Sequence, residues 1–239
     1  MMINLTKHQE KQIEVVSKIE KQIESNSLTV STVKPVEDFI NDKRLTLTSV
    51  HFPSEFLKNK ILDLVKPLKE ISPEFYYFPT EALHTTIKNI RVINDPPNFS
   101  DEDVDKAKKI FSDVIPNHYK FKIYFYKLLL FPNNLALIGT TDEELDNIIF
   151  DLDKKLKKSN VADDKQYVNS KYFFCNITLA RFSQPISEEF RKKVKEISEK
   201  MKFEPYVVDS VSLLKTNVVL HEPKIIGTWK LKSGKLDCE

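Results

Sequence analysis

The sequence predicts an α+β protein built from two similar halves. Helix and strand patterns alternate along most of its 239 residues, and several neighbouring strands are close enough to form hairpins. A short motif that starts at Leu83 returns in altered form at Cys175, 92 residues later, which indicates a duplicated half-fold. With 41% hydrophobic and 30% charged residues, the composition is that of a globular protein.

The first 42 residues are predicted to form a segment of helix and linker that precedes the main domain. Thr6 and Gln9 have the pattern of a capping box, and apolar residues then recur at helical spacing as far as Ile23. This predicts an amphipathic helix of about 20 residues, whose narrow apolar stripe favours packing on the main body over coiled-coil or membrane binding. A contact with a protein partner is the alternative use. The Ser/Thr-rich stretch 25–34 is predicted to be a linker, and residues 43–239 to be the main domain.

Within residues 43–239, strands follow from apolar and β-branched runs, and helices from acidic first turns and 3.6-residue periodicity. Pro132, Asn133 and Asn134 predict a tight turn between two strands. The expected elements are, in order, a strand at 44–52, a helix at 53–70, a strand at 83–93, a helix at 101–115, strands at 120–131 and 134–140, a helix at 142–158, a strand at 172–182, a helix at 187–202, and strands at 206–218 and 225–231.

Composition excludes several classes of function. The 37 basic and 35 acidic residues give a net charge of +2, so phosphate binding has to be local rather than through a basic coat. Three glycines cannot build a P-loop or a dinucleotide-binding fingerprint. Two cysteines, Cys175 and Cys238, provide neither a disulfide scaffold nor a multi-cysteine zinc site. We expect a reducing, cytoplasmic location, because the amino terminus lacks a signal peptide and no run of 18 apolar residues occurs.

The repeated motif carries the candidate chemistry. Residues two apart on a strand share a face, so His84 points the same way as Thr86, and Asn176 the same way as Thr178. An imidazole can move a proton while a nearby hydroxyl donates a hydrogen bond to a phosphate oxygen. Two such strands could therefore hold one phosphodiester between them.

The segments RLTLTSVHFPSEF, FPTEALHTTIKNI, NITLARF and the closing VDSVSLLKTNVV and IGTWKL resemble the 2H phosphoesterase superfamily over about residues 43–232. They resemble in particular its LigT-like branch of 2′-5′ RNA ligases and 2′,3′-cyclic phosphodiesterases. The resemblance implies two lobes of antiparallel sheet, helices outside them, and a central cleft that receives a phosphodiester. It also implies that no metal or other cofactor is needed.

Carried over residue by residue, the resemblance assigns His84 and Thr86 to the first motif and Thr178 and Arg181 to the second. Asn176 departs from it, because the family has a second histidine there. One family histidine acts as base and the other protonates the leaving oxygen, and asparagine can do neither. Its amide can still bind a phosphate oxygen, so binding can survive where turnover is impaired.

Three explanations of Asn176 stay open: natural divergence, an engineered substitution that traps a ligand, or replacement of the lost base by another side chain. His51 and His221 are the candidates for replacement, and His8 and His118 are weaker ones.

Two cations and several aromatic residues complete the prediction. Arg181 has odd parity relative to Thr178, so it reaches the cleft only if the strand ends or bulges near Ala180. Lys88 shares parity with His84 and could add positive charge for substrate binding. The aromatic residues that precede the two motifs are candidates for base stacking, although core packing is the more common role: Tyr76, Tyr77, Tyr172 and Phe173.

The sequence therefore predicts a metal-independent phosphodiesterase-like protein that acts on 2′,3′-cyclic phosphate or 2′-5′-linked RNA or nucleotide ends, impaired at Asn176. The alternative is a non-catalytic module that binds nucleotides or RNA ends in the same cleft. A third alternative is a structural protein that has kept the fold and lost the site. We expect a monomer whose partners are RNA ends or cyclic nucleotides, with no membrane association.

Overall fold

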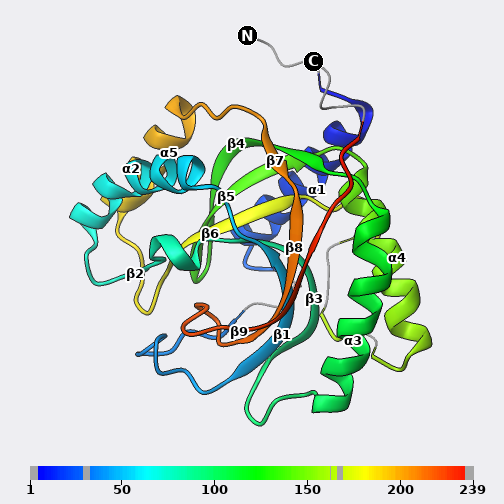
Figure 1. The fold of residues 1–239 in the computed structure, drawn as a ribbon. Helices are drawn as coiled ribbons and strands as arrows, with labels where there is room; N and C mark the ends of the chain where they lie inside the picture. Colours follow the sequence, from blue (N-terminus) through cyan, green and yellow to red (C-terminus); the bar gives the residue numbers. More distant parts are fainter. Residues whose placement is uncertain (1–4, 29–32, 162, 166–168, 235–239) are drawn as a thin grey trace.

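One antiparallel sheet organises the chain (Figure 1). The structure is a computed structural model that describes residues 5–28, 33–161, 163–165 and 169–234. Within them, strand order across the sheet is β7-β4-β5-β6-β3-β1-β8-β9, and the short β2 pairs with β6. The strands are β1 Leu45–His51, β2 Tyr76–Tyr77, β3 Thr85–Asn94, β4 Phe121–Phe131, β5 Asn134–Thr141, β6 Cys175–Arg181, β7 Tyr206–Val208, β8 Ser210–Thr216 and β9 Lys224–Lys230.

The sheet has two halves, as the duplicated motif predicts. One half is β7-β4-β5-β6 and the other is β3-β1-β8-β9. They meet where Thr85 of β3 pairs with Ile177 of β6. The predicted α+β class is therefore confirmed, and the two expected sheets are joined edge to edge into one.

The sheet is curled, and the strand predicted at 206–218 shows why. It is two strands separated by Asp209. β7 pairs with β4 at one edge of the sheet, whereas β8 pairs with β1 next to the opposite edge. Because one residue connects them, the two ends of the sheet have to approach each other. This closure gives the sheet an inner and an outer face.

Four helices cover the outer face (Figure 1). α2 and α5 pack on each other, and α5 contacts β4, while α3 contacts β9 and α4 contacts β3. α3 begins at a capping box in which Ser100 and Asp103 satisfy each other's backbone amides. Their bounds are α2 Glu55–Ile71, α3 Asp101–Val114, α4 Glu144–Lys158 and α5 Glu188–Lys200, and short 3₁₀ turns lie at Thr80–Ala82 and Ile115–Asn117.

The amino-terminal helix α1, Lys7–Glu24, is placed differently. Its capping box of Thr6 and Gln9 is present as predicted. Its apolar stripe packs against Ala136 and Ile138 of β5, which point to the face opposite to Leu135 and Leu137 in the main core. α1 therefore covers part of the inner face. Of the predicted linker 25–34, residues 29–32 lie outside the described residues, as does Cys238.

The strand predicted from residue 172 starts only at Cys175. Two side chains take the backbone groups of Phe173 that a neighbouring strand would otherwise use. Asp146 of α4 accepts a hydrogen bond from the amide at 3.0 Å, and Gln12 of α1 donates one to the carbonyl at 2.5 Å. The segment 172–174 is consequently held by two helices. No helix among the described residues is long and apolar enough to cross a membrane.

Candidate functional site

A cavity of about 420 Å³ lies between β3 and β6 on the inner face. Side chains from both copies of the motif line it, together with residues of β1, α1 and the segment before β6. Because β3 and β6 are neighbours in the sheet, the two motifs come together although 92 residues separate them. The motif residues at the cavity are His84, Thr86, Asn176 and Thr178.

Arg181 also lines the cavity, because β6 contains a bulge. Two consecutive residues of β5 pair with Ala180 and Thr178, so Leu179 is an extra residue on β6. A bulge of this kind reverses the alternation of side chains. The irregularity that the sequence required near Ala180 is therefore present.

A second bulge has the opposite effect on Lys88. Consecutive residues of β1 pair with Thr86 and Lys88, so Ile87 is the extra residue on β3. The alternation of side chains along β3 therefore shifts by one residue after Thr86. Lys88 no longer points to the same side as Thr86, and Asn89 lines the cavity instead. The expectation that Lys88 adds charge to the substrate site is thus corrected.

Lys88 is buried on the other side of β3 with 1% of its side chain exposed. Its ammonium lies 2.6 Å from Asp153 of α4 and also contacts Asp163. A buried ammonium with two carboxylate partners has a structural role, since removing the ammonium or the carboxylates would leave the opposite charge uncompensated. Lys88 thus fixes α4 and the 163–165 segment to the sheet.

His84 is positioned as a proton acceptor. Its Nδ1 lies 2.7 Å from the carbonyl oxygen of Ala82, which requires the proton on Nδ1 and leaves the lone pair on Nε2. Burial, opposed by this hydrogen bond and reinforced by the charge of Arg181, lowers the pKa of His84 to about 4. The imidazole is therefore neutral near pH 7.

Arg181 supplies the positive charge. Burial lowers the pKa of its guanidinium to about 10, so it stays cationic at neutral pH. The guanidinium carbon lies 5.9 Å from the ring centre of Phe78, and that ring is in turn 6.0 Å from His84. Among the described residues, the buried Nε of Arg181 has no hydrogen-bond partner. An unused buried donor is costly, and a ligand anion in the cavity would satisfy it.

The other four histidines do not line the cavity. His51 is buried, with its ring nitrogens 2.9 Å from the Ser210 carbonyl and from the Tyr206 hydroxyl. His118 lies between two carboxylates of α4, and His8 lies at the start of α1. His221 is exposed in the turn before β9. The structure brings none of them to Asn176 as a replacement base.

Several polar residues that sequence reasoning missed also line the cavity, and Asn89 and Lys165 are among them. Asn89 follows Thr86 by three residues, as Arg181 follows Thr178, so the 92-residue offset of the motif contained the signal. The hydroxyl of Thr48 donates to the Asn89 side-chain oxygen at 2.7 Å, which leaves the amide nitrogen as the group for a ligand. Lys165 had no motif signal. Burial lowers its pKa to about 8.

Of the four aromatic candidates, Tyr172 and Phe173 line the cavity, whereas Tyr76 and Tyr77 do not. In the described part of the chain, no group of three or more His, Cys, Asp or Glu side chains is arranged to hold a metal ion.

The environment of His84 predicts a specific pH dependence of stability. Its pKa is about 4 in the folded protein and about 6.5 when unfolded, so the unfolded chain binds more protons between these values. Stability contributed by the neutral ring is therefore complete above pH 6.5 and decreases as the pH falls towards 4. We expect this group alone to lower the free energy of unfolding by about 2 kcal/mol between pH 7 and pH 5.

Urea unfolding of wild type and His84→Asn at the two pH values measures this effect. The variant should lose less stability on acidification, by about that amount. Equal losses in both proteins would mean that His84 is not held neutral by burial.

No protein-family model matches the sequence, and no curated protein matches it either. Solved structures do match. Escherichia coli LigT without ligand aligns with a TM-score of 0.53 at 12% identity, covering 80% of this chain and 99% of LigT. TT0787 of Thermus thermophilus aligns with a TM-score of 0.51 at 14% identity, covering 80% of this chain and 98% of that one. The chain adopts the fold of LigT.

A conserved protein of unknown function from Agrobacterium tumefaciens also has a similar structure. It aligns with a TM-score of 0.55 at 13% identity, covering 74% of this chain and 83% of that protein's chain. The LigT-like fold thus covers about four fifths of the chain, and the remaining fifth has no counterpart in LigT. At these identities the likeness concerns the fold, so function has to be argued from the cavity.

Proposed function

We propose that this protein binds phosphate esters of the 2′,3′-cyclic or 2′-5′-linked nucleotide type in the cavity between β3 and β6. It acts on them as a metal-independent phosphodiesterase whose turnover is impaired by Asn176. The observation that carries the proposal is that one cavity is lined by His84, by the threonines of both motifs and by an arginine whose buried Nε is an unused donor. A soluble, cytoplasmic monomer acting on RNA ends or cyclic nucleotides completes the proposal.

The arrangement suits a phosphodiester. The hydroxyls of Thr86 and Thr178 and the guanidinium of Arg181 can donate hydrogen bonds to its non-bridging oxygens, and the positive charge balances the negative one. The similar solved structures add support, because one LigT structure with a TM-score of 0.51 is a complex with phosphate. Another, with a TM-score of 0.50, is a complex with 3′-AMP.

In hydrolysis, a water oxygen would form a bond to phosphorus while the bond from phosphorus to one ribose oxygen breaks. The water proton would pass to the free Nε2 of His84. The leaving ribose oxygen would have to take its proton from solvent, because the amide of Asn176 donates hydrogen bonds but is not an acid that transfers a proton. Positioning and charge stabilisation without the second acid support a slow reaction.

The second candidate function is binding without turnover. It is favoured by Asn176, which retains a hydrogen-bonding group at the cavity and lacks one that transfers protons. Such a module would recognise nucleotide or RNA ends with the same residues. The apolar stripe of α1 is engaged on the sheet, so a partner that binds α1 would have to use its polar face.

Ligand titration tests the proposal. We expect Thr86→Val and Thr178→Val each to weaken binding of a 2′,3′-cyclic nucleotide by about 10- to 100-fold, the loss of one hydrogen bond to a charged group. Isothermal titration calorimetry measures this affinity directly.

Thr228→Val is the matched control, because Thr228 is an exposed threonine of β9 that does not line the cavity. It should leave the affinity unchanged. If wild type binds neither cyclic nucleotides nor phosphate, the phosphodiesterase and the binding module are both rejected.

A further inference from the structure

The amino-terminal helix lies against the same sheet face as the candidate site. Val15, Val16 and Ile19 of α1 form a small core with Ala136 and Ile138 of β5. Those two strand residues are the register partners of Thr178 and Asn176 on β6. The packing surface of α1 is thus continuous with the floor of the cavity.

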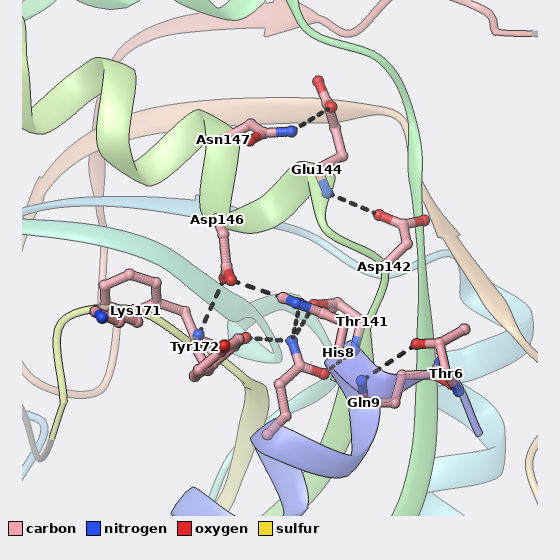
Figure 2. Close-up of polar contacts among 12 residues, drawn as sticks. Thr6, His8, Gln9, Thr141, Asp142, Glu144, Asp146, Asn147, Lys171 and Tyr172 are labelled. Atoms are coloured by element: carbon pink, nitrogen blue, oxygen red, sulfur yellow. Dashed lines mark hydrogen bonds and ion pairs between the residues drawn. The ribbon is translucent and has the colours of Figure 1, made fainter.

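A buried polar cluster fixes the start of α1 in this position (Figure 2). Gln12 is fully buried. It accepts a hydrogen bond from the amide of Thr141 at 2.8 Å, and it donates to the Thr141 hydroxyl at 2.7 Å and to the Phe173 carbonyl. The ring of His8 lies 3.5 Å from the carboxylate of Asp146. These contacts join α1 to β5, to α4 and to the segment that enters β6, so the helix is an integral part of the fold.

Two faces of α1 meet the sheet differently. Val15 and Ile19 line the cavity, whereas Val16 is buried against the same strands without lining it. Tyr172 and Phe174 pack on this cluster and line the cavity too. Apolar side chains of α1 and the 172–174 segment therefore form part of the wall of the cavity that the polar motif residues also line.

We infer that α1 and the 172–174 segment form a nucleobase subsite next to the phosphate-binding residues. The inference rests on the proposed function, since it takes the phosphate to lie at the two motifs. Planar bases stack on aromatic side chains, and aliphatic side chains next to those aromatic ones exclude water from the base. Val15 and Ile19 then act as specificity-determining residues that make the protein prefer a nucleotide to a cyclic phosphate without a base.

Two ligands separate the subsite from the phosphate site. 2′,3′-Cyclic AMP carries a base, whereas glycerol 1,2-cyclic phosphate has the same five-membered cyclic phosphodiester without one. We expect wild type to bind the nucleotide at least about 10-fold more tightly, as one stacked base provides. Titration calorimetry of the full chain with both ligands measures this ratio.

Variants of α1 then test its part in the subsite. Ile19→Ala removes part of the wall and Ile19→Phe fills the space. Each should weaken binding of 2′,3′-cyclic AMP by about 5-fold or more and leave glycerol cyclic phosphate unchanged. Val16→Ala is the matched control because it thins the same helix packing outside the cavity, and it should change neither affinity. Circular dichroism confirms that each variant is folded.

The outcomes are distinct. Equal affinity of wild type for the two ligands, or equal effects of the Ile19 and Val16 variants, would overturn the base subsite and leave the phosphate site intact. If wild type binds neither ligand, the proposed function is rejected, and the base subsite with it.

Discussion

Asn176→His is expected to raise the rate of 2′,3′-cyclic nucleotide hydrolysis by about 10²- to 10⁴-fold, the contribution of one acid/base group. The side chain of residue 176 lines the cavity from β6. This strand pairs with β3, which begins directly after His84. A histidine there could protonate the leaving oxygen while His84 Nε2 takes the proton of the attacking water. Chromatography of the nucleoside 2′- or 3′-monophosphate formed when the cyclic phosphate opens measures the rate.

His84→Ala is the companion variant. In the Asn176→His background it should remove the gained activity, because the neutral Nε2 acceptor is lost. If wild type, Asn176→His and His84→Ala all match the buffer blank, the enzymatic interpretation is rejected. Saturable binding of the nucleotide in that case would support the binding module.

Lys88→Met is expected to lower the free energy of unfolding by about 3 kcal/mol or more. The substitution keeps the length of the side chain and leaves Asp153 and Asp163 facing each other without their shared cation. Repulsion and desolvation of the carboxylates oppose folding, and Asp153 is partly exposed, which places the effect at the low end of the range for buried pairs. Urea unfolding at pH 7 measures it.

Two further variants make that test specific. Lys109→Met removes an exposed lysine of α3 and should change stability by no more than about 0.5 kcal/mol. Adding Asp163→Asn to Lys88→Met should recover part of the loss, because the repulsion between the two carboxylates that contact Lys88 is then removed. A loss for Lys88→Met as small as that for Lys109→Met would show that the buried cluster contributes little.

Local patterns were sufficient for most helices and strands. The capping box of Thr6 and Gln9 starts α1, and the acidic first turn after Ser100 starts α3. Such signals act over three or four residues of the same segment, so they are visible without the fold. The predictions that missed involve partners remote in the chain, such as Gln12 holding Phe173 out of β6.

The candidate site divides in the same way. His84, Thr86, Asn176 and Thr178 could be identified from a repeated motif and a resemblance, because their types and spacing are written along the chain. The roles of Lys88 and Asn89 could not, since they depend on a bulge at Ile87 that exists only in the pairing of β3 with β1.

The linear order of residues thus contained the α+β class, the duplicated halves and the residue types that could handle a phosphate. The folded chain settled which of those residues share a surface. Side-chain direction on a strand reverses at each bulge, and bulges arise from pairing between distant strands. The same reasoning applies to α1, whose amphipathic pattern required a covering surface but left open that this surface is the inner face of the sheet beside the cavity.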